Sequence, residues 1–284
     1  MEITSGKPEI IIGLIDGPVV RNHPDLAVEH IRYMPAKLSS ACTRSDSLAC
    51  RHGTFVAGIL SAKRGSPAPA ICPDCTLLVR PIFAETDSAN GDIPSTKPEG
   101  LAEAILDCVR AGARVLNISA AIAQPSSKSE YDLEVALNEA AGRGVIVVAA
   151  AGNQGTLGGT AITSHPWVIP VVAYDQMGRP MGLSTLGSSI GRRGLGAPGD
   201  RITSLGSEEK PLTLGGTSFA APFVTGAIAL LWSKYPNATA VEIKLAILQA
   251  HKGRRVTVVP PLIDVWAAYQ SLAYSGYSRR ANLQ

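Results

Sequence analysis

Four polar side chains have the types that acyl-transfer chemistry needs: Asp16, His52, Asn153 and Ser218. A serine hydroxyl becomes a useful nucleophile when a neighbouring base takes its proton. A neutral imidazole can act as that base and later protonate a leaving amine, while a buried carboxylate fixes its tautomer. An amide side chain and a backbone N–H can together stabilise an oxyanion. In the chain order Asp, His, Ser, these residues predict a serine hydrolase.

Each of the four residues also has a structural explanation of its own. Asp16 could cap a turn with Gly17, and His52 could be a polar residue at a helix start. Ser218 could serve only as a helix cap, and Asn153 could be a turn residue. We favour catalysis because all four lie at strand ends or helix starts, where the groups of one site can meet.

Alternating apolar runs and helical patterns supply those strand ends and helix starts. Continuous β-branched runs predict strands that are buried on both faces, as in a parallel sheet. The expected strands are 9–16, 76–83, 113–119, 145–152, 167–175 and 201–206. The expected helices are 52–62, 97–112, 129–144, one from Thr217 onward, and a last one at 240–249.

This alternation predicts an α/β fold with three layers, α/β/α, around a central and mostly parallel sheet. In such sheets the working site lies at the carboxyl ends of the strands. We expect one domain over residues 1–274, a flexible C-terminal tail over 275–284, and surface loops at 33–51 and 85–97.

Composition excludes several other classes of protein. The 284 residues carry a net charge of +3 and are 45% hydrophobic, which indicates a globular core without a strong field for nucleic acid. The longest apolar stretch, 219–232, is shorter than a membrane span and contains Pro222 and Gly226. The first residues lack the basic and apolar regions of a signal peptide, so we expect a soluble, cytoplasmic protein.

Five cysteines are present, and their odd number suits free thiols in a reducing compartment. Cys72 and Cys75 form a C-x-x-C pair that could be redox-active, or could supply half of a zinc site with Cys42 and Cys50. The alternative is that these thiols, with Cys108, are buried or locally bridged. A zinc pattern would need a second C-x-x-C, which is missing, so we expect no metal and no cofactor.

Four segments carry a resemblance to a known family: "IIIGLIDGPVVRNHPDL", "HGTFVAGI", "VIVVAAAGNQG" and "GGTSFAAPFVTGAIALL". In order and spacing they resemble the subtilisin-like serine proteases, over about residues 9–249. Within that family, "DGPV", "CPDCTLLVRPIFAE" and "LGAPGDRI" look most like the proteases of cyanobactin-type ribosomal peptide pathways. Those enzymes cut a precursor peptide at recognition sequences that flank its core.

The resemblance implies a role for each matching residue. Asp16 would orient His52, His52 would be the general base, and Ser218 would be the nucleophile. The Asn153 side chain and the Ser218 N–H would form the oxyanion hole. The segment "LNISAAIA" would pair with the substrate as an edge strand. The residues implied to line the substrate site are Ser119, Ala120, Ala121, Ala149, Ala150, Ala151 and Gly152.

The chain also departs from the family pattern. Gly17 and Pro18 follow the aspartate, where relatives usually have Ser or Thr and then Gly. Phe55 replaces a second histidine, and Ala121 stands where a glycine is usual, which could narrow the cleft. The segment 61–70 has no carboxylate, so the calcium site of secreted relatives is expected to be missing. An inhibitory propeptide before the first strand is also not expected.

The resemblance predicts a serine endopeptidase that forms an acyl-enzyme at Ser218 and hydrolyses it with water. Its expected partner is an extended peptide, such as a ribosomal peptide precursor, and neither nucleic acid nor a membrane. One alternative is a macrocyclase, in which the substrate's own amine resolves the acyl-enzyme. Cyclising relatives carry a helical insertion, for which the separation of 36 positions between Asp16 and His52 leaves little room. A second alternative is a non-catalytic peptide-binding module.

Overall fold

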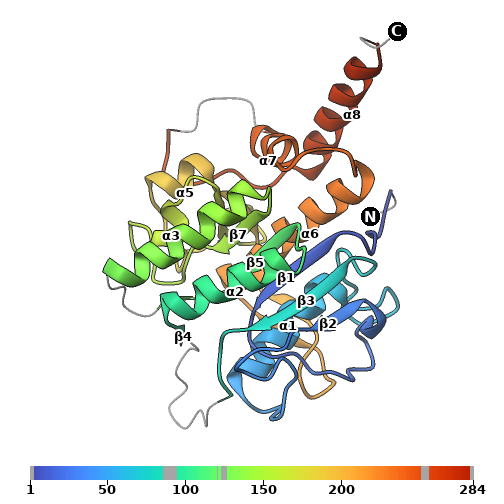
Figure 1. Ribbon diagram of the computed structural model, residues 1–284, viewed down its shortest axis with the longest axis vertical. Coiled ribbons are helices and arrows are strands. Elements are labelled where there is room, and N and C mark those ends of the chain that lie inside the picture. Colours follow the sequence, from blue (N-terminus) through green and yellow to red (C-terminus); the bar gives the residue numbers. More distant parts are fainter. Residues whose placement is uncertain (1–2, 86–94, 120, 123–126, 251–255, 282–284) are drawn as a thin grey trace.

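The computed structural model describes residues 3–85, 95–119, 121–122, 127–250 and 256–281 (Figure 1). Its centre is a seven-stranded sheet with the strand order β2-β3-β1-β5-β7-β8-β9, and every pairing in it is parallel. Buried β-branched runs therefore form the parallel sheet that they predicted. The strands are β1 (Ile11–Asp16), β2 (Ile31–Tyr33), β3 (Thr76–Pro81), β5 (Val115–Ile118), β7 (Ile146–Ala150), β8 (Val168–Tyr174) and β9 (Leu195–Pro198).

Helices cover both faces of this sheet, which makes the three expected layers. The helices are α1 (Leu48–Ser61), α2 (Pro98–Arg110), α3 (Ser127–Gly142), α4 (Ala161–Ser164), α5 (Ser188–Arg193), α6 (Thr217–Lys234), α7 (Ala240–Gln249) and α8 (Val265–Ala281). In Figure 1, α2 and α3 lie together in front of the strands. The long helices α1 and α6 pack against each other, and α6 also packs along β5, β7, β8 and β9.

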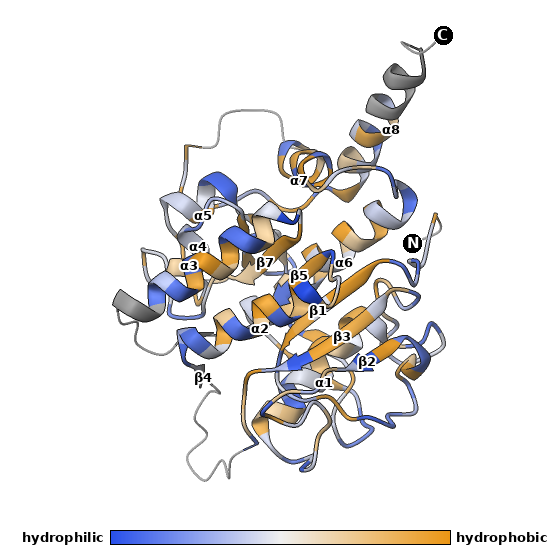
Figure 2. Cartoon of the chain, in the orientation of Figure 1, coloured by the Kyte–Doolittle hydropathy of each residue, from blue (hydrophilic) through white to orange (hydrophobic). Residues whose placement is uncertain are grey.

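Two separate apolar cores result, one on each face of the sheet. Because side chains alternate along a strand, Val115 joins the core under α1 and α6, whereas Leu116 joins the core under α2 and α3. Val147 and Val148 divide between the two cores in the same way. Figure 2 shows the matching pattern, with β1 and β3 largely hydrophobic and α2 and α3 two-sided.

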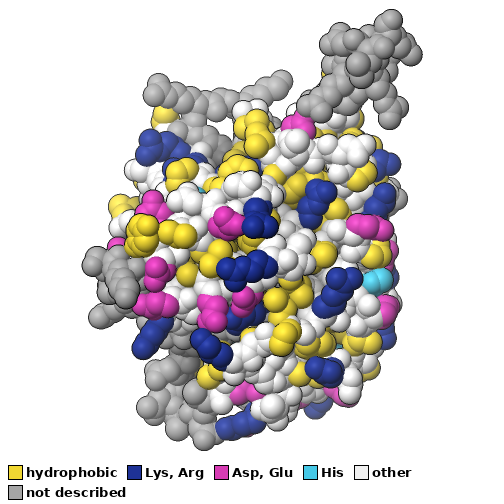
Figure 3. Space-filling view, in the orientation of Figure 1, with side chains coloured by type: hydrophobic (Ala, Val, Ile, Leu, Met, Phe, Trp, Pro, Cys, Tyr) yellow, Lys and Arg dark blue, Asp and Glu magenta, His cyan; other side chains and the backbone are white. Residues whose placement is uncertain are grey.

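Smaller elements lie outside the main sheet. β10 (Ile202–Ser204) pairs antiparallel with β11 (Leu212–Leu214), and β4 (Ser95–Thr96) pairs parallel with β6 (Ala121–Ile122). A short 3-10 helix, η1 (Val28–His30), precedes β2. On the face drawn in Figure 3, basic and acidic side chains are interspersed, so their charges offset each other locally. Among the described residues, no helix combines the length and the apolar character that crossing a bilayer requires.

The structure corrects several expected boundaries. α1 begins at Leu48 rather than at His52, because Ser47 caps it by accepting a hydrogen bond from the Cys50 N–H. The expected strand 201–206 is the short β10, which is not part of the main sheet. The helix at 240–249 is not the last, since α8 follows it and is helical through residues 275–281 of the expected tail.

Candidate active site

The carboxyl end of β1 and the second turn of α1 bring Asp16 and His52 together. Asp16 is the last residue of β1 and its side chain is fully buried. Its Oδ1 accepts a hydrogen bond from the Gly17 N–H at 2.6 Å and another from His52 Nδ1 at 2.7 Å. Because the carboxylate can only accept, Nδ1 carries the proton and Nε2 is left as the basic nitrogen.

Burial and charge act in opposite directions on this histidine. Burial lowers the pKa of His52, because it disfavours the charged imidazolium. The negative charge of Asp16 and its hydrogen bond raise that pKa, and together they outweigh burial. The net result is a pKa above the ordinary value of 6.5. The pair therefore favours an imidazolium, which is the charge state that a base acquires when it takes a proton.

Ser218 is the second residue of α6, and a proline four residues later shapes its surroundings. Pro222 has no N–H, so it cannot donate to the Ser218 carbonyl as a helix residue normally would. The Ser119 hydroxyl donates to that carbonyl instead, at 3.0 Å. Asn117 donates to the Ser119 hydroxyl at 2.8 Å, and Thr225 donates to Asn117 at 2.9 Å. This polar chain ties the start of α6 to the end of β5.

The histidine and the serine lie in one neighbourhood without being hydrogen-bonded. The ring of Phe219, the residue after Ser218, is 5.2 Å from the His52 ring, centroid to centroid. The Ser218 hydroxyl donates to the Ser119 carbonyl oxygen at 3.4 Å rather than to His52. In unliganded enzymes such contacts are often long and tighten only with substrate.

Asn153 follows β7, and Thr217 at the start of α6 holds its side chain. The Asn153 Oδ1 accepts hydrogen bonds from the Thr217 N–H and from the Thr217 hydroxyl, both at 2.9 Å. An N–H can only donate, so the amide oxygen must face Thr217 and the NH2 group must face away from it. Gly216, with φ 141°, gives the NH2 group room, since a Cβ there would be 3.1 Å from Nδ2. Sequence reasoning missed the role of Thr217, because it depends on a contact across 64 residues.

The segment that the resemblance assigned to substrate pairing is already partly paired. Ser119 is buried after the end of β5, and Ala120 lies outside the described residues. Ala121 begins β6, where its backbone is in register with Ser95 of β4. One edge of β6 is therefore occupied by the chain itself, and a peptide would have to add to the other edge or displace β4.

The four residues expected to line the pocket differ in burial. Ala149 and Ala151 belong to the apolar cores, with side chains 1% and 2% exposed. Ala150 and Gly152 are half-buried, so they are the two of this set that offer surface to a ligand. The side chain of the exposed Gln154 lies against Gly152, because a Cβ at Gly152 would be 2.5 Å from its Oε1.

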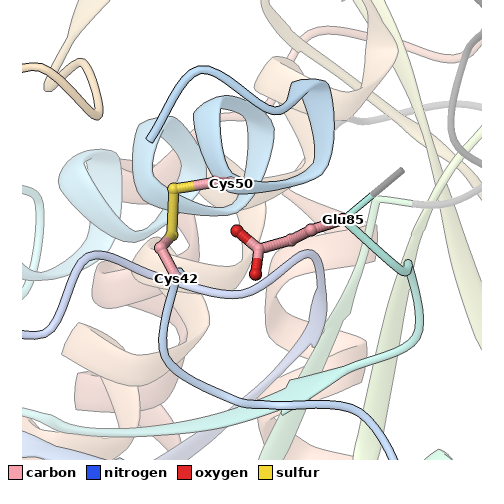
Figure 4. A group of neighbouring side chains, drawn as sticks. All are labelled: Cys42, Cys50 and Glu85. Atoms are coloured by element: carbon pink, nitrogen blue, oxygen red, sulfur yellow. A yellow bond between two sulfur atoms is a disulfide. The ribbon is translucent and has the colours of Figure 1, made fainter. Parts of the chain in front are cut away.

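Figure 4 shows a group of neighbouring cysteine and carboxylate side chains around the start of α1: Cys42, Cys50 and Glu85. Cys42 and Cys50 form a disulfide, so of the readings left open by the sequence these two cysteines follow the locally bridged one. Their sulfur atoms are bonded to each other and are not thiolate ligands. The other three cysteines, Cys72, Cys75 and Cys108, are free and buried.

Comparison with known proteins places the chain in a family. The thermostable alkaline protease of Halalkalibacterium halodurans is 31% identical over 231 residues, which are 81% of this chain and 59% of that protein. Thus the chain spans about six-tenths of the length of that relative. The family model described as the subtilase family, Peptidase S8, matches residues 7–272.

Solved structures of peptide-maturing enzymes superpose on most of the chain. A serine-to-alanine mutant of the PatA protease domain has a TM-score of 0.85 and 30% identity. The match covers 97% of this chain and 99% of the PatA chain. The prenylagaramide maturation protease PagA has a TM-score of 0.81 and 28% identity, and the match covers 95% of this chain and 96% of the PagA chain. The PatG macrocyclase shares the fold, with 21% identity and a TM-score of 0.79. That match covers 95% of this chain and 94% of the PatG chain. The family model over residues 7–272 and the 31% identical relative show that this chain belongs to the subtilase family.

Proposed function

We propose that this chain is a serine endopeptidase whose triad is Asp16, His52 and Ser218. The observation that carries the proposal is the 2.7 Å hydrogen bond between the buried Asp16 carboxylate and His52 Nδ1. That contact leaves the His52 Nε2 lone pair directed away from Asp16, as a general base requires. Membership of the subtilase family and the position of Ser218 at the start of α6 support the same assignment.

In the proposed reaction, His52 Nε2 takes the proton of the Ser218 hydroxyl as its oxygen attacks the peptide carbonyl. The Asn153 NH2 group and the Ser218 N–H donate to the oxyanion that forms. His52 then gives the proton to the leaving amine, and the peptide's acyl group stays on Ser218 as an ester. Water, deprotonated by His52, hydrolyses that ester and restores the free enzyme.

The proposed substrate is an extended peptide, namely a ribosomal peptide precursor that is cut at a recognition sequence. PagA, described as a prenylagaramide maturation protease, supports this class of substrate through its likeness over 95% of the chain. The backbone of β6 and the half-buried Ala150 and Gly152 would contact the peptide beside Ser218. We expect β-type pairing, in which backbone groups give affinity and side-chain pockets give specificity.

Cyclisation by the substrate's own amine remains the alternative outcome on the same triad. Between Asp16 and His52, which are 36 positions apart, the chain contains only η1 and β2 before α1 begins. No longer helix stands in this interval to shield the acyl-enzyme from water. Hydrolysis is therefore favoured, and a non-catalytic binding module is disfavoured because all four chemical positions are filled.

Incubation with a precursor peptide, followed by mass spectrometry, tests the proposal. Linear fragments are expected, whereas a cyclic product would establish the macrocyclase instead. A fluorophosphonate should label the native chain and fail to label Ser218→Ala. No label on a folded native chain would favour the binding module.

We also propose the cytoplasm as the compartment, on the strength of the three buried free thiols. The Cys42–Cys50 disulfide weighs against it, because such bonds are more usual in oxidising compartments. Cell fractionation with antibody detection of the chain decides between the two.

A further inference from the structure

At Gly17 the backbone leaving β1 runs unusually close to the backbone of α1. A Cβ placed on Gly17 would lie 2.0 Å from the carbonyl oxygen of Ala49 and 2.7 Å from its carbonyl carbon. Side-chain Cβ atoms essentially never approach another atom within 3.0 Å. The obstructing atoms belong to the helix backbone rather than to a flexible side chain, so they cannot move without α1.

The contact is reciprocal, because α1 presents a glycine of its own to the same segment. A Cβ on Gly53 would lie 2.5 Å from the carbonyl oxygens of both Gly17 and Pro18. Two glycines therefore let a strand end and a helix pack backbone against backbone. Asp16 and His52 are the immediate neighbours of these two glycines in the chain.

We propose that Gly17 is a positioning residue that sets the distance between Asp16 and His52. This inference rests on the proposed function, since it concerns the pair that would activate Ser218. It also accounts for the departure of this chain from the family pattern, in which a serine or threonine usually follows the aspartate. In this chain such a side chain has no space, because α1 lies where it would be.

The expected consequence follows from the distances. To admit a Cβ at position 17, its separation from the Ala49 oxygen must widen from 2.0 Å to at least 3.0 Å. His52 lies one helical turn after Ala49 and would move with it. The Asp16–His52 contact is 2.7 Å, and a similar widening would take it beyond normal hydrogen-bond length.

The test replaces Gly17 with the family's usual residue, Gly17→Ser, and with alanine, Gly17→Ala. We expect kcat to fall about 100-fold or more, with KM little changed, as for an active-site displacement of about 1 Å. The acidic limb of the pH–rate profile should move to lower pH, because the raising influence of Asp16 weakens while burial persists. The matched control is Gly65→Ala, where a Cβ would meet nothing within 4 Å, and it should change neither quantity.

Circular dichroism establishes that each variant is folded, and Gly53→Ala gives a second, less obstructed variant. Gly53→Ala should also move the acidic limb of the pH–rate profile to lower pH, with a smaller loss of kcat than Gly17→Ser. In a Ser218→Ala background, the downfield NMR signal of the His52 Nδ1 proton should disappear in Gly17→Ser and persist in Gly65→Ala.

The two proposals fail in different ways. A folded Gly17→Ser with unchanged kcat, pH profile and Nδ1 signal overturns the positioning role. A native chain that shows the Nδ1 signal but neither cleaves peptides nor reacts with a fluorophosphonate overturns the proposed function and leaves the positioning role standing.

Discussion

The Asp16 carboxylate uses its two oxygens unequally. Oδ1 accepts from Gly17 and His52, while Oδ2 is buried and has no hydrogen-bond partner in the part of the chain that the structure describes. An incompletely partnered buried carboxylate is costly, and an adjacent positive charge offsets that cost. In the proposed reaction, the His52 imidazolium that forms as Ser218 is deprotonated would supply this charge. The buried Asp16 would then stabilise the transition state more than the resting enzyme.

The raised pKa of His52 predicts the pH dependence of the reaction. Only neutral His52 can accept a proton, so kcat/KM should rise with pH through the histidine pKa, with its midpoint above 6.5. The sign for stability is opposite: protonated His52 stabilises the fold below the unfolded-state pKa, and this contribution is lost as pH rises through the raised folded-state pKa.

Rates of peptide cleavage measured from about pH 5 to 9 check this midpoint against the ordinary histidine range. As a control, Asp16→Asn should lower kcat by about 10⁴-fold and move the acidic limb to lower pH. A native midpoint at or below 6.5 would show that Asp16 does not outweigh burial.

At the oxyanion site, Asn153→Ala should lower kcat by about 10²–10³-fold with little change in KM, because the lost donor acts on the oxyanion. Thr217→Ala should lower kcat less, since its N–H still holds the Asn153 oxygen while its hydroxyl is gone. Thr213→Ala, at the exposed central position of β11, serves as the control and should be neutral. Steady-state kinetics measure all three variants. If Asn153→Ala raised KM and left kcat unchanged, the oxyanion role would be contradicted.

Among the elements, α1 is held firmly where it begins. Glu85, which follows β3, accepts hydrogen bonds from the Thr43 N–H and hydroxyl, the Arg44 N–H and the Ser47 hydroxyl. Burial alone would raise the pKa of Glu85, but these hydrogen bonds from Thr43, Arg44 and Ser47 lower it overall. Glu85 and the disulfide therefore fasten the same loop to the first turn of α1 (Figure 4).

Removal of the disulfide should lower stability more than activity. The Cys42–Cys50 bond closes a loop with a sequence separation of 8, and opening it should lower the free energy of unfolding by about 2–3 kcal/mol. The triad should survive, because α1 is buried along most of its length. Thermal unfolding of Cys42→Ser/Cys50→Ser against the native chain measures the effect. Dithiothreitol should lower the Tm of the native chain and leave the Tm of the double variant unchanged. An equal fall in Tm in the double variant would show that the reductant does not act through this disulfide.

For the whole molecule, the strands β1, β3, β5, β7 and β8 follow closely from their apolar runs. β9 was missed because it contains Gly196 and Pro198, which are poor strand formers. Tertiary packing explains the glycine, since a Cβ at Gly196 would lie 2.3 Å from the ring of Tyr174. In the missed helix α8, half of the side chains with described burial are exposed, and only Ala268 and Leu272 among them are buried. Its pattern is therefore too weak to distinguish it from a loop.

The candidate site residues were easier to predict from the sequence than the residues that hold them in place. Asp16, His52, Asn153 and Ser218 occur in short motifs, so the sequence nominates them as candidates without knowledge of the fold. Contacts such as that of Thr217 with Asn153 join residues far apart in the chain, and no local pattern encodes them. The Cys42–Cys50 pairing was missed for a different reason, because an odd number of cysteines leaves the pairing undetermined.

Truncation tests the predicted domain limit. α8 projects beyond α7 in Figure 1, and its buried residues, Ala268 and Leu272, lie before position 275. A chain ending at Tyr274 should keep the Tm and activity of the full chain. A chain ending at Ile263 loses those apolar contacts and should unfold at least about 5 °C lower. Differential scanning calorimetry separates the cases, and an equal loss in both would place the domain limit later.

The proline in α6 has a consequence for how the chain acquires its chemistry. The Ser218 carbonyl finds its donor in Ser119, 99 residues earlier, so α6 alone cannot complete the turn that holds the nucleophile. Helices form early in folding, whereas contacts of such long sequence separation form late. A nascent or partly folded chain can thus contain α6 without a working nucleophile. The proposed protease would become active only when these last long-range contacts form. Partly folded copies of the chain would therefore cleave one another slowly.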